Sequence, residues 1–238
     1  MILLTTVLSC LELGFIYSLV VMPVWLSSTV IRFYDLSVEG SFCTGGAITA
    51  LLLHANCPIV ATVPIAICVG VLIGMCTGLL HTTLRVQDLL CGIIVSTGLF
   101  SINLALASPN KSLAHVKTLF SGVGSISWES GNLVVTAIIA GIVLYGIRWL
   151  LSTEIGLILR TLGENPALLT DIGKSQGMYT IGTLMLCNAS VALAGSLFVQ
   201  YIGFFSIWSS VGILVVALTG LKIGQLINHR LGVHIIAG

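Results

Sequence analysis

Two acidic residues, Asp35 and Glu39, stand at the start of an apolar stretch that is rich in glycine. A carboxylate in apolar surroundings is costly, and it usually faces a protein interior or a water-filled route. Because glycine permits close backbone approach and sharp turns, the stretch could line such a route and move as a gate. The alternative is an inner loop in which Asp35 pairs with Arg32 at the level of the lipid headgroups. The pathway candidates here are Asp35, Ser37, Glu39, Gly40, Ser41, Gly45 and Gly46.

A second constellation lies in the polar stretch 152–177, which contains GENPALLTDIG at 163–173. Asn165 suits the N-cap of a short helix, Pro166 its first position and Gly173 the position just past its end. Apolar residues recur within it at helical spacing and predict an apolar face. Such a face needs a partner's groove or the membrane surface, and we favour the partner. The docking candidates are Gly163, Glu164, Asn165, Pro166, Leu168, Leu169, Ile172 and Gly173.

A third constellation, FFSIWSSVG at 204–212, leads into LTGL at 218–221 and loosely echoes FYDL at 33–36. Matching broken segments in the two halves of a chain are typical of transporters built from repeats. Ser206 and Gly212 therefore join the pathway candidates. Asn103 joins them too, although an amide in an apolar helix can equally bridge two helices.

Signals for enzyme chemistry are weak. Gly173-Lys174-Ser175 matches only the end of a phosphate-binding loop, because the first glycine of that motif would fall on Leu168. We therefore expect that this chain does not hydrolyse ATP itself. No cluster has metal-ligand spacing, so neither a metal nor a cofactor is predicted.

Composition places the chain in a membrane. Of its 238 residues, 57% are hydrophobic and 7% are charged, whereas a soluble domain carries about 25% charged residues. The charged residues, 9 basic and 8 acidic, give no basic field for nucleic acid. The expected environment is the lipid bilayer.

The predicted fold is an all-α, polytopic membrane protein with about six to eight membrane segments. Long apolar stretches, each about 20 residues as a span requires, lie near 13–31, 58–80, 89–107, 131–150 and 179–200. Two further stretches, near 40–54 and 206–221, are interrupted by glycine and serine and predict half-helices or re-entrant segments. Irregular backbone at membrane depth must be enclosed by protein or face a cavity.

The loop charges predict an orientation. With the N-terminus outside, loop 108–130 is external, and only Lys111 and Lys117 remain on the outer side. The seven other basic residues then lie inside, as the positive-inside rule requires: Arg32, Arg85, Arg148, Arg160, Lys174, Lys222 and Arg230.

With these motifs in view, the chain resembles the inner-membrane permease subunits of bacterial ABC importers, in the group of the branched-chain amino acid and ribose permeases. DLSVEGSF at 35–42 carries the resemblance most specifically. DLLCGII at 88–94, SINL at 101–104, GENP at 163–166 and ASVALAGSL at 189–197 extend it. It covers about Glu12 to Gly224 and implies one permease domain over 1–238, with a cytoplasmic coupling loop at 151–178, in the bacterial inner membrane.

The resemblance also implies partners. A second permease subunit, identical or similar, would complete the pore, and cytoplasmic ATP-binding subunits would drive it. An extracytoplasmic solute-binding protein would deliver a small solute, which the family branch suggests is an amino acid. In the family, the loop matching Gly163 to Gly173 contacts the ATPase. Similar permeases continue past the position of Gly238, so this chain is short at its C-terminus relative to them. The rival interpretation is an ion-coupled secondary transporter.

Overall fold

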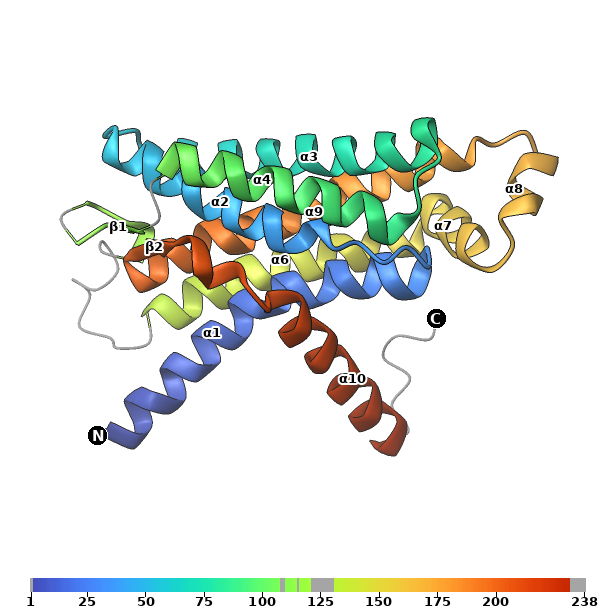
Figure 1. Ribbon diagram of the computed structural model, residues 1–238. Coiled ribbons are helices and arrows are strands. Elements are labelled where there is room, and N and C mark those ends of the chain that lie inside the picture. Colours follow the sequence, from blue (N-terminus) through green and yellow to red (C-terminus); the bar gives the residue numbers. More distant parts are fainter. Residues whose placement is uncertain (1, 108–109, 115, 121–130, 232–238) are drawn as a thin grey trace.

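A computed structural model describes residues 2–107, 110–114, 116–120 and 131–231 (Figure 1). Within these ranges the chain is almost wholly helical. The long helices are α1 (Ile2–Trp25), α2 (Ser37–His54), α3 (Ile59–Leu84), α4 (Asp88–Ala107), α6 (Gly131–Ser152), α9 (Gln176–Ile202) and α10 (Ile213–Leu231). The shorter elements are the π-helix η1 (Leu26–Val30), α7 (Glu154–Glu164), α8 (Pro166–Asp171), the 3-10 helix η2 (Ile207–Ser210), β1 (Asn110–Ser112) and β2 (Phe204–Ser206).

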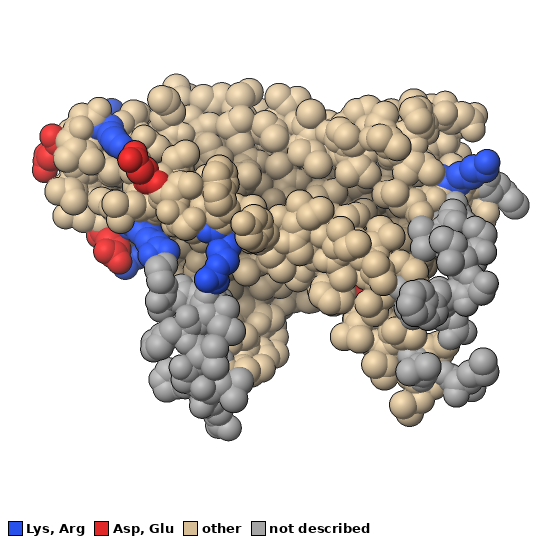
Figure 2. Space-filling view, turned by 180° about the vertical axis from the view of Figure 1, so that it is seen from behind, with Lys and Arg blue, Asp and Glu red and all other residues tan. Residues whose placement is uncertain are grey.

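Six helical segments among the described residues are long and apolar enough to cross a membrane. They are Thr5–Val30, Ile59–Leu84, Asp88–Ala107, Gly131–Ser152, Gln176–Ile202 and Ile207–Ile227. Figure 2 shows that charged side chains gather at the ends of the bundle and leave its flank almost uncharged. The prediction of an all-α, polytopic membrane protein is confirmed.

Helices α2 and α9 form the centre of the bundle. α3 packs along α9, and α2 is enclosed by α9, α4 and α3 (Figure 1). Most residues of α2 are buried, as is 78% of the most apolar window of α9, whereas the outer helices expose apolar side chains as lipid-facing helices do. These two central helices can therefore carry several buried polar side chains.

The half-helix predicted near 40–54 is present as α2, which runs without interruption from Ser37 to His54 and is not among the segments long and apolar enough to cross a membrane. The irregular backbone comes before it, at 31–36, where the chain is not helical. Ser37 lies beside Thr77, seven residues before the end of α3, which corresponds to about 10 Å along a helix axis. Figure 1 likewise shows α2 beginning inside the bundle rather than at its end.

The second predicted break is present in part. After α9, the chain passes through β2 and η2 before α10 begins at Ile213, and Gly212 adopts a left-handed φ of 83°. From there α10 continues without interruption through Gly220. Each half of the chain thus carries one irregular stretch.

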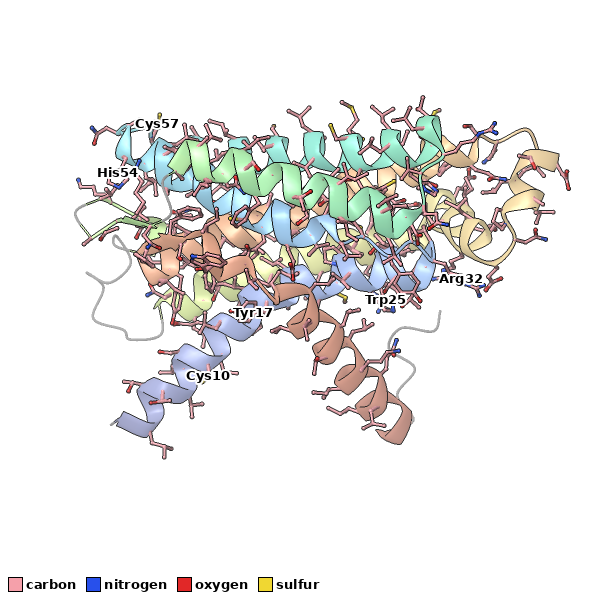
Figure 3. The ribbon with its side chains drawn as sticks, in the orientation of Figure 1. Cys10, Tyr17, Trp25, Arg32, His54 and Cys57 are labelled. Carbon is pink, nitrogen blue, oxygen red and sulfur yellow. The ribbon has the colours of Figure 1, made fainter. Side chains whose placement is uncertain are left out.

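The two ends of the bundle differ. Arg32 and Arg85 lie at the end that carries α7 and α8, whereas His54 and Cys57 lie at the opposite end (Figure 3). At that opposite end β1 pairs antiparallel with β2, Lys111 lying opposite Phe205. The structure therefore groups these basic residues as the predicted orientation requires. Much of the predicted external loop 108–130 lies outside the described residues.

Candidate functional site

The centre of the bundle contains a buried polar network around the start of α2. Asn188 of α9 donates from Nδ2 to Asp35 Oδ2 at 2.8 Å, and its Oδ1 accepts a hydrogen bond from Ser41 Oγ at 2.5 Å. Ser37 Oγ lies 2.5 Å from Asp35 Oδ1 and 3.2 Å from Asn188 Oδ1. Thr77 of α3 donates to Ser37 Oγ at 3.3 Å. The network joins α2, α3, α9 and the irregular segment 31–36.

The sequence builds this network at a helix start. The first N–H groups of a helix lack partners within it, and Asp35 Oδ1 accepts the backbone N–H of Ser37 at 2.8 Å. The positive end of the α2 dipole also favours a carboxylate at this place. Asp35 is 4% exposed, so neutral donors and a helix terminus, rather than a cation, surround the carboxylate.

The alternative pairing of Asp35 with Arg32 is not found. Asp35 is buried, whereas Arg32 is exposed at the α7–α8 end. Among the described residues, the side-chain partners of Asp35 are Ser37 and Asn188. The carboxylate therefore belongs to the protein interior and not to the headgroup level.

Glu39 joins the two irregular stretches. Its Oε1 accepts the backbone N–H of Gly212 at 3.0 Å, where the chain turns from η2 into α10. The left-handed φ of Gly212 suits glycine far better than other residues. The Glu39 carboxylate therefore binds the backbone at a position where glycine is strongly favoured. This hydrogen bond links the start of α2 to the start of α10.

Asn103 bridges α4 and α2 by donating from Nδ2 to Thr44 Oγ1 at 3.0 Å. Its Oδ1 is the one buried side-chain nitrogen or oxygen in the described parts of the chain without a hydrogen-bond partner. Ser206 lies elsewhere, in β2 opposite Asn110. The structure thus brings Asp35, Ser37 and Ser41 together and places Ser206 apart from them.

The three candidate glycines of α2 lie against neighbouring helices. A Cβ at Gly45 would stand 2.2 Å from the carbonyl oxygen of Ala192, and one at Gly46 would stand 2.7 Å from Val199 Cγ2. A Cβ at Gly40 would stand 2.8 Å from Leu99 Cδ1 of α4. Close approach through small residues is how helices associate without a hydrophobic driving force in lipid. Whether these positions also line a route stays a prediction.

Sequence reasoning did not place Asn188 and Thr77 in the site, nor the hydrogen bonds farther along α2 and α9. Thr49 donates to Ser196 Oγ at 2.7 Å, and Gln200 Oε1 accepts the backbone N–H of Leu119 at 3.1 Å. The signal was available, because Asn188, Ser196 and Gln200 recur at multiples of four residues and so share one face of a helix. That face of α9 meets α2.

The second constellation folds as a short helix, with Pro166 in its first turn and Gly173 in the left-handed region at φ 74°. Asn165 occupies the N-cap position but makes no side-chain capping bond. The apolar face divides: Leu168 is 47% and Ile172 58% exposed, whereas Leu169 is fully buried. The predicted single docking stripe is therefore wrong for Leu169, which packs in a cluster with Ile31, Phe33, Ile158, Leu159, Leu162 and Leu184.

Gly163 and Glu164 end α7 just before this helix. A Cβ at Gly163 would stand 1.9 Å from the carbonyl oxygen of Val30, so Gly163 packs against η1 rather than presenting a free surface. Glu164 is exposed. The exposed docking candidates are thus Glu164, Asn165, Pro166, Leu168, Ile172 and Gly173.

Comparison with known proteins places these features in context. The family described as "Branched-chain amino acid transport system / permease component" matches residues 6–237. The "Tyrosine transport system permease protein" of Clostridioides difficile (strain R20291) is 31% identical over 92% of this chain and 72% of its own length. "Uncharacterized protein RP368" of Rickettsia prowazekii (strain Madrid E) is 29% identical over 92% of this chain and 76% of its own length. No solved structure matches significantly.

Proposed function

Since the chain belongs to the family of branched-chain amino acid transport system permease components, we propose that separate ATP-binding subunits drive the transport in which it takes part. The chain is a multi-pass protein of the bacterial inner membrane and a transport subunit. ATP hydrolysis is assigned to partner chains, and the α7–α8 end is assigned to the cytoplasm. A second permease subunit and an external solute-binding protein complete the proposed importer.

The proposed cargo is an amino acid. Support comes from the relative named as a tyrosine transport permease, which is 31% identical over 92% of this chain. The buried hydroxyl and amide groups along α2 and α9 offer neutral hydrogen-bond partners to a zwitterion once these helices separate. The solute-binding protein would supply most of the selectivity.

One observation carries the proposal: two irregular stretches of backbone, 31–36 and 203–212, pack against the central helix α2 and are joined by the hydrogen bond from Gly212 N to Glu39 Oε1. Discontinuous backbone at membrane depth marks the sites of transporters. It is tolerated only where protein or a water-filled cavity surrounds it. A purely structural membrane subunit would have no need of it.

The contacts of α8 suggest how a movement of α8 could be passed to segment 31–36 and to the start of α10. Leu169 of α8 packs with Ile31 and Phe33, and Asp35 follows two residues later at the polar network. Movement of α8 by a closing ATPase would therefore pull on segment 31–36 directly. That segment would shift Asp35 against Asn188 and, through Glu39, change the start of α10.

Replacing Leu168 with glutamate is expected to lower ATP-driven uptake at least about tenfold, because a charge in an apolar contact costs roughly 1–3 kcal/mol or more when it lacks a partner. The measurement is uptake and ATPase activity of the reconstituted complex. Thr170→Glu, which adds the same charge at an exposed position of α8, is the control. Normal uptake by the Leu168→Glu complex would remove the docking role. Gly163 is unsuitable for this test because of its contact with η1.

Replacing Glu39 with leucine is expected to reduce uptake more than replacing it with glutamine, because glutamine keeps a side-chain oxygen that can accept the Gly212 N–H. The expected loss for leucine is about tenfold, the size of one hydrogen bond to a charged group. Uptake is measured in proteoliposomes at equal amounts of folded protein. Equal losses in the two variants would show that this hydrogen bond is not what matters at Glu39.

The rival interpretation, ion-coupled transport, rests on Glu12, which is 5% exposed and accepts a hydrogen bond from Tyr201 Oη at 2.6 Å. A buried carboxylate in a span is a hypothesis for proton coupling. Uptake by the purified chain on a proton gradient alone, with no ATP-binding subunit present, would replace the proposed function with this one.

A further inference from the structure

A cavity of about 620 Å³ opens beside the docking helix. Its walls come from the loop after η1, the turn between α3 and α4, the junction of α7 with α8, and the start of α9. The lining residues that matter here are Arg32, Phe33, His81, Arg85, Asp88 and Pro166. Four separate segments of the chain therefore meet around one space.

The cavity is cationic. Arg32 and Arg85 face one carboxylate, Asp88, whose Oδ2 accepts the backbone N–H of Tyr34 at 3.3 Å. His81 lies beside them, with Nδ1 at 2.9 Å from the carbonyl oxygen of Val86. In the ranges that the structure describes, no ion pair involves either arginine. Two charged side chains are thus available to an incoming anion.

The exposed residues of the lining show where the cavity opens. Arg32, Arg85, Gln87 and Pro166 are exposed, and all four lie at the α7–α8 end, the first three in loops and Pro166 at the start of α8. Figure 3 shows Arg32 at that end of the bundle. Pro166 is also the first residue of α8, so the mouth of the cavity is continuous with the exposed Leu168 and Ile172.

We propose that this cavity receives an acidic side chain of the ATP-binding subunit, as a second coupling point beside α8. The inference rests on the proposed function. An arginine pair suits a carboxylate, because guanidinium groups present forked donors that match its two oxygens. The position of the mouth beside α8 favours a docked protein over a lipid.

The second coupling point has a mechanical consequence. Arg32 and Phe33 line the cavity, and Asp35 follows in the same irregular segment and accepts a hydrogen bond from Asn188. A carboxylate bound by Arg32 would therefore act on segment 31–36 without passing through α8. The ATPase would then act on segment 31–36 at two points, through Leu169 of α8 and directly at Arg32.

The test measures the affinity of the co-expressed ATP-binding subunit for the full chain in nanodiscs, at low and high salt. Arg32→Gln and Arg85→Gln are each expected to raise the Kd up to about fivefold at low salt, and the double variant more. The difference should shrink at high salt, where exposed charges are screened. Lys222→Gln, an exposed residue of α10 outside the cavity lining, removes the same charge and should leave the Kd unchanged.

The outcomes separate the two proposals. If the wild-type chain binds the ATP-binding subunit and the double variant binds it with equal Kd and salt dependence, the cavity is not a docking site, while the proposed function stands. If the wild-type chain binds no ATP-binding subunit, the proposed function itself fails. If the double variant keeps the Kd but loses co-purifying phosphatidylglycerol, the cavity holds a lipid headgroup and the inference is overturned.

Discussion

Replacing Asn188 with leucine is expected to abolish uptake and to lower the amount of folded chain in the membrane. The change leaves Asp35 Oδ2 without its donor and Ser41 Oγ without its acceptor. Each buried polar group left without a partner costs about 1–3 kcal/mol, and a charged one costs more. Together these losses approach the whole stability of a typical domain, about 5–15 kcal/mol. Thermal unfolding in detergent and uptake in proteoliposomes measure the two effects.

Two further variants sharpen this prediction. Ser190→Ala removes only a bond to Leu186 O within the same helix, so it should leave stability nearly unchanged. The double variant Asp35→Leu, Asn188→Leu removes both partners and should recover part of the stability, because an apolar pair leaves no unmet charge. If Asn188→Leu unfolds at the temperature of Ser190→Ala, the network does not stabilise the bundle.

Replacing Gly45 with alanine is expected to destabilise the bundle by about 3 kcal/mol. The added Cβ would lie 2.2 Å from the carbonyl oxygen of Ala192, which is backbone and cannot rotate away, so α2 and α9 would have to separate. Every hydrogen bond between these helices would lengthen, and uptake should fall with stability.

Gly98→Ala is the matched control for this prediction, because a Cβ at Gly98 of α4 meets nothing within 4 Å. Alanine at an exposed helical position is expected to be neutral or stabilising, by up to about 1 kcal/mol. The comparison is the shift in unfolding temperature. Similar shifts for the two variants would mean that α2 and α9 are not packed as closely as the structure shows.

The fold was largely predictable because lipid imposes a strong rule on sequence. A span must be long and apolar to satisfy its backbone in hydrocarbon, so α3, α4, α6 and α9 were recognisable from composition alone. Asn165, Pro166 and Gly173 likewise carried local signals for the limits of α8. The glycines of α2 do not interrupt it, because residues that often end helices in water permit close helix packing in a bundle.

The site was less predictable because its members are far apart in the sequence. Asp35 and Ser37 were found as neighbours in one motif, but their partner Asn188 comes 153 residues after Asp35. Which face of α9 meets α2 depends on how all the helices pack, and a single sequence does not state that. The burial of Leu169 was missed for a related reason. Helical spacing places Leu168, Leu169 and Ile172 on one broad apolar face, but it does not show which of them is buried against the bundle.

The enclosure of α2 has a consequence for biogenesis. This helix is not among the candidate spans of the described chain, since Glu39 and its many small and polar residues make it a poor substrate for direct partitioning into lipid. Its main neighbour α9 begins at Gln176, far downstream of His54. During synthesis, we therefore expect α2 to stay in the aqueous insertion channel, or paired with α3, until α9 has been made and can pack against it.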